Sequence, residues 1–294
     1  DEDFRQILAG TLNFMTEHQV PYYKKMARVG VLRHLLVRKA VKTGEILVDL
    51  VTATPGYPQE LEPAYVDMLL SLPLKGKLVG ILHTKNDALA DVVQNDGTDI
   101  LYGQDFFYEE LLGLRFKITP FSFFQTNSLG AEVLYDTARR YIGDTTGKTI
   151  YDLYSGTGTI AQFVSSKASK VFGIEYVPEA IADARLNAAN NGITNCEFFA
   201  GDMKDILTDG FIRTHGRPDV IILDPPRAGI HPDVAKVILN AQPERMVYVS
   251  CNPASQARDL ALFAEKYEIT AVQPVDMFPQ TQHVENVCAL KLRQ

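Results

Sequence analysis

The sequence predicts an α/β protein with a doubly wound, mostly parallel sheet and a smaller N-terminal α+β domain. Two observations lead to this prediction. From residue 148 onward, short apolar segments typical of strands alternate with segments typical of helices, which favours a parallel sheet with helices on both faces. Before residue 119 the elements do not alternate in this way and include a hairpin. We therefore expect two domains, residues 1–118 and 119–294.

The N-terminal domain is expected to begin with a helix, because apolar residues recur at helical spacing over residues 1–17. Two strands rich in Val, Leu and Ile follow at 28–41 and 45–54. Lys42-Thr43-Gly44 between them predicts a tight turn. The remaining elements expected here are a helix at 58–70 and strands at 78–83, 99–101 and 114–119.

In the second domain, Asn127 is placed to cap a helix over residues 128–141. Strands are expected at 149–154, 170–175, 196–199, 219–224, 245–250, 268–276 and 286–292. Helices are expected between them at 159–167, 178–191, 232–240 and 254–266. Pro253 suits the start of the last helix, because its missing N–H would have no intrahelical partner there.

The composition is that of an ordinary globular protein. The chain has 294 residues, 46% of them hydrophobic and 22% charged, and its apolar runs are too short to span a membrane. No signal peptide is expected, since no basic segment followed by an apolar one opens the sequence. Cys196, Cys251 and Cys288 are widely spaced and odd in number, which argues against disulfides and metal sites. We expect a cytoplasmic monomer without a bound metal.

The charge distribution is uneven. A formal net charge of −7 argues mildly against nucleic acid as a partner, because binding phosphate normally requires a basic surface. Residues 24–42 are the exception, with seven Lys or Arg side chains and no acid. This segment is either a solvated hairpin face or a contact for RNA, and the sequence favours neither.

Cys251 lies where the apolar strand 245–250 meets the start of a helix. Ligands bind at this carboxyl edge of an open α/β sheet, and a helix N-terminus favours the thiolate form of a cysteine. From these residues alone, a nucleophile and a buried structural cysteine are equally compatible interpretations. Glu285, just before the last strand, is an acid that such a sheet could bring close to Cys251 as a base.

A glycine-rich turn follows the first strand of the second domain, in Asp152-Leu153-Tyr154-Ser155-Gly156-Thr157-Gly158. Glycines let a backbone approach a ligand closely, and Glu175 ends the next strand, where an acid accepts hydrogen bonds from ribose hydroxyls. Asp202 ends the third strand and suits either contact with an adenine amine or a helix cap. The turn also satisfies the loose dinucleotide fingerprint, so a nicotinamide-dependent oxidoreductase is an alternative.

Two further segments place polar groups at the expected ligand edge. Asp224 follows a buried strand in Leu223-Asp224-Pro225-Pro226-Arg227. An unpaired buried carboxylate is costly, so Asp224 is expected to meet a ligand or a basic group. The segment Phe121-Ser122-Phe123-Phe124-Gln125-Thr126-Asn127 suits either core packing or a surface on which a base stacks.

Taken together, these segments resemble one family. Phe-Phe-Gln-Thr-Asn, Asp-Leu-Tyr-Ser-Gly-Thr-Gly, Asp-Pro-Pro-Arg, Ser-Cys-Asn-Pro and His-Val-Glu-Asn occur in this order in the S-adenosylmethionine-dependent RNA uracil-5-methyltransferases, which make 5-methyluridine in tRNA and ribosomal RNA. The resemblance is strong over residues 105–294 and weak before them. It implies a Rossmann-like class I methyltransferase domain, S-adenosylmethionine as cofactor and RNA as substrate, with 23S ribosomal RNA favoured over tRNA. Members usually carry an N-terminal RNA-binding β-barrel, and many ribosomal members a four-cysteine iron–sulfur site, and neither is visible in this sequence.

The resemblance also implies roles for single residues. Cys251 would be the nucleophile that adds to C6 of uracil, and Glu285 the base that removes the C5 proton. The expected cofactor site consists of Gln125, Tyr154, Gly156, Glu175, Asp202 and Asp224. Ser155 and Thr159 stand where some members carry Cys and Asn. The alternatives are a methyltransferase acting on an exocyclic amine, which needs no cysteine, and a non-enzymatic RNA-binding protein.

Overall fold

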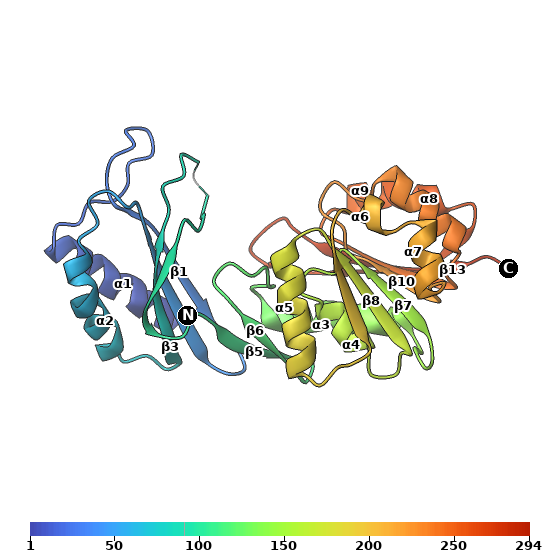
Figure 1. The fold of residues 1–294 in the computed structure, drawn as a ribbon, viewed down its shortest axis with the longest axis horizontal. Helices are drawn as coiled ribbons and strands as arrows, with labels where there is room; N and C mark the ends of the chain where they lie inside the picture. The colour runs from blue at the N-terminus through green and yellow to red at the C-terminus, as the bar shows by residue number, and fades with distance from the viewer. Residues whose placement is uncertain (91) are drawn as a thin grey trace. The chain divides into compact units, whose positions relative to one another are not determined.

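The computed structural model describes residues 1–90 and 92–294 (Figure 1). The chain separates into two compact units. Unit 1 comprises Asp1–Glu110 with Phe116–Phe121, and unit 2 comprises Leu111–Arg115 with Ser122–Gln294. The expected domains 1–118 and 119–294 stay a prediction, because this division does not show which segments fold independently.

Unit 1 contains a four-stranded sheet with two helices packed on it. The strand order is β1-β2-β3-β4, with β2 and β3 parallel and the two outer pairs antiparallel. Apolar side chains of both helices and the central strands form its core. The bounds are α1 (Glu2–Glu17), β1 (Leu32–Lys39), β2 (Glu45–Thr52), η1 (Gln59–Leu61), α2 (Glu62–Ser71), β3 (Lys77–Lys85) and β4 (Thr98–Gly103). The predicted α+β character is confirmed, although residues 28–31, predicted as strand, precede β1. A separate two-stranded sheet follows, formed by β5 (Phe107–Leu111) and β6 (Leu114–Ile118).

Unit 2 contains a seven-stranded sheet in the order β12-β13-β11-β10-β7-β8-β9. The five strands from β11 to β9 are parallel, and β13 runs antiparallel to both of its neighbours. The strand bounds are β7 (Thr149–Leu153), β8 (Lys170–Glu175), β9 (Cys196–Ala200), β10 (Val220–Leu223), β11 (Arg245–Ser250), β12 (Tyr267–Val275) and β13 (Glu285–Leu292). The predicted doubly wound, mostly parallel sheet is therefore confirmed.

Helices cover both faces of this sheet (Figure 1). α3, α4 and α5 contact one face, and α6 to α9 cover an apolar core on the other face that includes Tyr151, Phe172 and Met246. The helix bounds are α3 (Ser128–Ile142), α4 (Thr159–Val164), α5 (Pro178–Asn190), α6 (Met203–Ile206), α7 (Asp209–His215), α8 (Pro232–Ala241) and α9 (Pro253–Phe263). The sequence predicted neither α6 nor α7, because helices this short show too little periodicity.

The strand order of unit 2 identifies where a ligand would bind. The order reverses at β7, since β8 lies on one side of it and β10 on the other. In open α/β sheets, ligands bind outside the carboxyl ends of the strands at such a switch point. The turns that follow β7 and β10 flank this position.

Neither a membrane span nor a metal centre is found among residues 1–90 and 92–294. Within this part of the chain, every helix is too short or too polar to cross a bilayer. The same residues contain no group of three or more His, Cys, Asp or Glu side chains that could hold a metal ion.

Candidate active site

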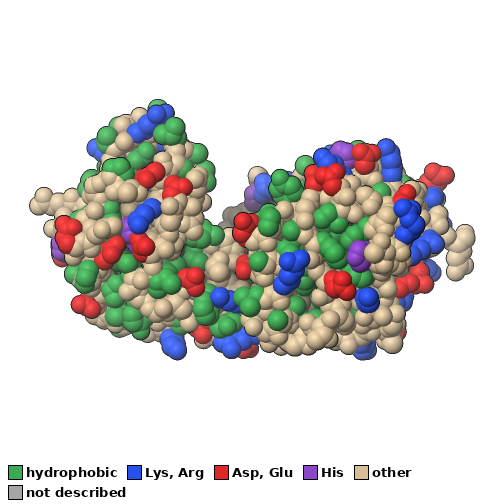
Figure 2. Space-filling view, in the orientation of Figure 1, with side chains coloured by type: hydrophobic (Ala, Val, Ile, Leu, Met, Phe, Trp, Pro, Cys, Tyr) green, Lys and Arg blue, Asp and Glu red, His purple; other side chains and the backbone are tan. Residues whose placement is uncertain are grey.

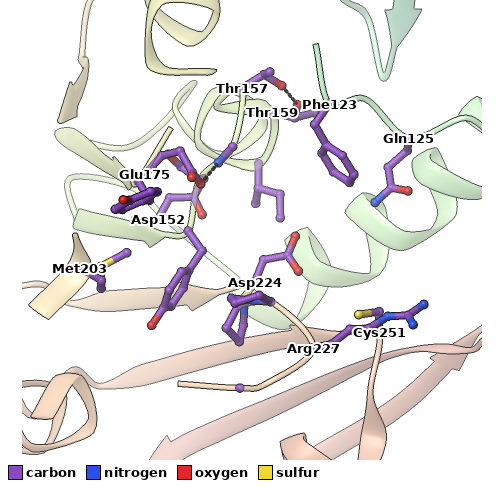
Figure 3. Close-up of a pocket in the computed structure, with 18 of the residues that line it drawn as sticks. Phe123, Gln125, Asp152, Thr157, Thr159, Glu175, Met203, Asp224, Arg227 and Cys251 are labelled. Carbon is purple, nitrogen blue, oxygen red and sulfur yellow. Dashed lines mark hydrogen bonds between the residues drawn. The ribbon is translucent and has the colours of Figure 1, made fainter. Parts of the chain in front are cut away.

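A cavity of about 680 Å³ lies at the carboxyl edge of the unit 2 sheet. Its wall includes the turns after β7 and β10, so it occupies the expected switch point. All eight residues singled out from the sequence line it: Gln125, Tyr154, Gly156, Glu175, Asp202, Asp224, Cys251 and Glu285. Figure 3 labels four of them, Gln125, Glu175, Asp224 and Cys251. A volume of this size suits a small-molecule ligand.

The turn between β7 and α4 depends on left-handed backbone. Tyr154, Gly156 and Gly158 have φ values of 64°, 53° and 72°. A Cβ added to Gly158 would lie 2.6 Å from Cε1 of Phe198 and 2.9 Å from Cβ of Ala184. Gly158 therefore provides both the backbone conformation and the close packing with which α4 begins.

We expect Gly158→Ala to lower the free energy of unfolding by about 2–5 kcal/mol, because left-handed backbone and overpacking each add a penalty. Gly147→Ala is the matched control, since Gly147 has a φ of 70° but no heavy atom within 4 Å of an added Cβ. Urea denaturation measures both variants. If both variants lost the same free energy of unfolding, close packing against Phe198 and Ala184 would contribute nothing to the effect of Gly158→Ala.

Asp152 supports the turn from inside. Its Oδ2 accepts a hydrogen bond from the Ala161 N–H of α4 at 2.9 Å. Burial raises the pKa of Asp152 to about 7. The hydrogen bond from Ala161 lowers this pKa, and the negative charge of Glu175 raises it further. Among the described residues, Asp152 Oδ1 and the Ser155 hydroxyl are buried without a hydrogen-bond partner. Buried polar atoms normally have partners, so both atoms indicate a ligand or water at this wall.

One acid, Glu175, ends β8, and another, Asp202, lies two residues after the end of the neighbouring strand β9. Glu175 accepts hydrogen bonds from the N–H of Gly156 at 3.0 Å and of Val177 at 3.1 Å, and each carboxylate oxygen keeps a second acceptor site. Asp202 accepts from the Lys204 N–H at 3.1 Å and caps α6, while it also lines the cavity. The two sequence interpretations of Asp202, a ligand contact and a helix cap, are therefore compatible with each other.

Asp224 carries its carboxyl group into the middle of the cavity (Figure 3). Burial raises its pKa to about 8, and the charges of Glu285, Asp152 and Glu175 act in the same direction. Three neighbouring carboxyl groups in the same cavity thus disfavour the ionisation of Asp224. A cationic ligand would reverse this effect.

The strand register brings Cys251 and Glu285 to the same edge of the sheet. Ser250, the last residue of β11, pairs with Asn286 of the antiparallel strand β13, so Cys251 and Glu285 each adjoin this last pair, and both line the cavity. Burial raises the pKa of Glu285, and the charge of Arg227 opposes the rise. A carboxylate with a raised pKa beside a thiol is suited to accept a proton at this end of the cavity.

One buried amide fixes the elements that carry this pair. α9 begins at Pro253, as predicted, directly after the loop that carries Cys251. Gln256 of α9 donates from Nε2 to the carbonyl of Tyr248 on β11 at 2.9 Å and to that of Asn286 on β13 at 3.1 Å. The helix and both strands are therefore held in register at the cavity edge.

The sequence did not single out several other lining residues. Arg227 lies on the Cys251 side of the cavity (Figure 3), and its carbonyl accepts from Asn252 Nδ2 at 3.1 Å. It follows Asp224 in a segment already recognised, so that segment could have indicated it. Tyr135 of α3 is buried at the wall, and burial together with nearby carboxylates raises its pKa. Nothing in the sequence distinguishes it from ordinary core residues of a helix.

The strand order, the antiparallel β13 and the cavity at the switch point define a class I S-adenosylmethionine-dependent methyltransferase fold. The crystal structure of the Pyrococcus abyssi tRNA (uracil-54, C5)-methyltransferase in complex with S-adenosyl-L-homocysteine matches with a TM-score of 0.81 and 30% sequence identity, over 97% of this chain and 66% of that chain. A putative methyltransferase from Streptococcus mutans shares the fold with a TM-score of 0.55 and 13% identity, over 98% of this chain and 82% of that one.

The chain belongs to the tRNA (uracil-5-)-methyltransferase family, whose sequence model matches residues 77–293. This confirms the family resemblance seen in the ordered motifs. An uncharacterized RNA methyltransferase from Clostridium tetani is 51% identical over 99% of this chain and 63% of the relative. One from Bacteroides thetaiotaomicron is 48% identical over 100% of this chain and 64% of the relative. The chain thus spans slightly less than two thirds of the length of these relatives.

Proposed function

We propose that this protein transfers a methyl group from S-adenosylmethionine to C5 of a uridine in RNA, through a covalent bond between Cys251 Sγ and C6 of the base. The observation that carries the proposal is that Cys251 and Glu285, which adjoin the last pair of β11 and β13, line one cavity together with the glycine turn and several acids. Family membership and the names of the relatives support the same reaction.

The residues of the cavity fit the cofactor. S-adenosylmethionine supplies an electrophilic methyl group on a sulfonium and also carries an ammonium group. Positive charge favours ionisation of the carboxyls at Asp152 and Asp224, whose pKa values are raised in the cavity. The buried Asp152 Oδ1 and Ser155 hydroxyl lack protein partners among the described residues, as a polar ligand site would require. The residues that we assign to holding the cofactor are Gln125, Tyr154, Gly156, Glu175, Asp202 and Asp224.

Cofactor binding is expected to release protons near neutral pH. Without ligand, the pKa of Asp224 is about 8 and that of Asp152 about 7, so both carboxyls are partly protonated at pH 7. A cation stabilises their ionised forms, so affinity rises with pH and weakens, for each of the two carboxyls, by up to about tenfold per unit as pH falls below its pKa. Titration calorimetry in two buffers with different ionisation enthalpies measures the protons released.

Two comparisons control this measurement. S-adenosylhomocysteine lacks the sulfonium charge, and Asp224→Asn lacks one of the titrating acids. Each should release fewer protons than the wild-type protein with S-adenosylmethionine. Equal proton release in all three titrations would show that the carboxyls of the cavity do not respond to the charge of the cofactor.

The residues at the other end of the cavity account for the chemistry. C5 of uracil is too weak a nucleophile to attack a methylsulfonium. When the Cys251 thiolate adds to C6, the C5=C6 electrons move toward C4=O, and C5 of the resulting enolate becomes nucleophilic. C5 then takes the methyl group and holds both a methyl and a proton.

Glu285 completes the reaction in this proposal. It accepts the C5 proton, the C5=C6 bond forms again, and the S–C6 bond breaks to return the thiolate of Cys251. One methyl group has then replaced one proton on the base. Because Arg227 opposes the effect of burial on the pKa of Glu285, it favours the ionised form that a base requires.

One experiment tests both the proposed reaction and the class of RNA that serves as substrate. We favour 23S ribosomal RNA from the resemblance, whereas the family model and the Pyrococcus abyssi neighbour are named for tRNA. The protein is incubated with S-adenosylmethionine and unmodified transcripts of each RNA, and the digested nucleosides are identified by mass spectrometry. We expect 5-methyluridine from the ribosomal transcript. Methylation of an exocyclic amine, or no transfer to either RNA, would refute the proposal.

A further inference from the structure

Unit 1 carries a projecting turn that the proposed chemistry does not use. Residues 21–30, which we call the basic turn, connect α1 to β1 and form a loop at one end of the unit 1 sheet (Figure 1). Its backbone is paired: Tyr23 N–H donates to Leu32 O and Lys24 N–H donates to Val29 O, both at 2.7 Å. The turn is therefore a short hairpin ahead of β1, and not the continuous strand predicted over residues 28–41.

The tip of the basic turn combines positive charge with exposed apolar side chains. Lys24, Lys25 and Arg28 are exposed, and no acid occurs between residues 18 and 44. Met26 is 95% exposed and Tyr22 68% exposed. Figure 2 shows Lys or Arg side chains beside hydrophobic ones at the end of unit 1 where the turn projects. Positive charge beside an exposed aromatic ring suits a partner that carries both phosphates and bases.

The base of the turn is fixed in place. The Arg33 guanidinium lies 4.5 Å from the ring centroid of Tyr23 and donates to the carbonyl of Asn86 at 2.7 Å, in the segment after β3. Gly30 has a φ of 112°, and an added Cβ would lie 2.2 Å from the Tyr22 carbonyl oxygen. A turn that is already ordered loses little conformational entropy when it binds.

We propose that the basic turn is a contact surface for the RNA substrate, with its cations against phosphates and Tyr22 and Met26 against an unpaired base. The proposal rests on the proposed function, which requires the protein to hold RNA. The chain has a formal net charge of −7, whereas this segment concentrates three cations without an acid, which favours contact with phosphates. Aromatic side chains stack on unpaired bases, which suits the exposed ring of Tyr22.

A matched pair of variants tests the charge contribution. The turn variant is Lys24→Ala with Arg28→Ala, and the control is Lys75→Ala with Lys77→Ala. The control removes the same charge at the opposite end of the sheet. The start of β1 and the end of β3 both lie level with Thr52 of β2, whereas Lys77 begins β3. Binding of a 23S ribosomal transcript and of bulk tRNA is measured over a range of salt concentrations.

We expect the turn variant to bind RNA about tenfold more weakly and to lower the slope of log affinity against log salt by about 1–2, since each phosphate contact contributes about 0.7–0.9. KM for RNA should rise by the same factor, with kcat unchanged at saturating RNA. Affinity for S-adenosylmethionine, which reports folding of unit 2, should be unchanged, and circular dichroism checks the folding of unit 1. The control variant should behave like the wild-type protein.

Tyr22→Ala tests the stacking contribution separately. It should weaken RNA binding about fivefold or more without changing the salt slope, because stacking releases no counterions. Equal RNA affinity of the turn variant, Tyr22→Ala and the control would overturn the proposal. So would a turn variant that keeps its RNA affinity but no longer binds phosphatidylglycerol vesicles, since the surface would then be a membrane contact.

The two proposals can fail independently. If the wild-type protein methylates RNA and the turn variant has an unchanged KM, the assignment of the basic turn is wrong and the proposed function stands. If the wild-type protein binds RNA through the turn but forms no 5-methyluridine, the proposed function is wrong and the RNA contact stands.

Discussion

Replacing Cys251 with alanine is expected to abolish methyl transfer to RNA, with a loss of at least about 10³-fold in kcat. Without the thiolate no bond forms at C6, and C5 stays too weak a nucleophile. The affinity for S-adenosylmethionine should stay within about twofold of the wild-type value, because the acids assigned to the cofactor come from other strands. A single-turnover assay with a labelled methyl donor measures the first effect and calorimetry the second.

Cys196→Ala is the control for this variant. Cys196 is also half-buried in unit 2, but it begins β9, its sulfur lies 3.7 Å from the Ala161 carbonyl, and burial raises its pKa to about 12. Its loss should leave the rate of transfer unchanged. Full activity of Cys251→Ala would instead favour methylation of an exocyclic amine, which requires no nucleophilic cysteine.

The Glu285→Gln variant is expected to accumulate a covalent complex between protein and RNA. Glutamine keeps the shape of the side chain at the start of β13 but cannot accept the C5 proton, so the S–C6 bond persists after methyl transfer. Turnover should fall by about 10²–10⁴-fold. The complex should appear as a shifted band of labelled RNA on a denaturing gel, only when S-adenosylmethionine is present.

Two variants check that the band has the proposed origin. Adding Cys251→Ala to Glu285→Gln should remove it, since no nucleophile is left. Glu268→Gln, which changes an exposed acid of β12, should give normal turnover and no accumulated complex. Wild-type turnover in Glu285→Gln would assign the base to another residue.

Much of the unit 2 fold could be predicted because its buried strands are short, continuous apolar runs. β8 and β11 have the bounds expected from the sequence, at 170–175 and 245–250. The sequence did not show where the turn before β1 ends and the strand begins, because residues 28–31 have the same kinds of side chain as the strand that follows. Arg28 has a φ of 53° and Gly30 one of 112°, and these backbone conformations interrupt the strand.

The sequence could identify residues of the candidate site, but it could not predict their arrangement in space. Cys251 and Glu285 are 34 positions apart, and only the antiparallel pairing of β13 with β11 brings them to the same edge of the sheet. The raised pKa of Asp224 depends on burial and on carboxyls from three other segments, which no local pattern reveals. Tyr135 reaches the cavity from the buried face of α3, where a core residue and a site residue look alike in the sequence.

The covalent mechanism is tested most directly by the mass of the protein after reaction with RNA that carries 5-fluorouridine at the target position. A base cannot remove fluorine as a cation, so the reaction stops with the S–C6 bond intact. We predict a complex of one protein, one RNA and one added methyl group, formed only with S-adenosylmethionine and mapped by peptide sequencing to Cys251. Attachment at Cys196 or Cys288, or release of methylated RNA without any covalent complex, would contradict the mechanism.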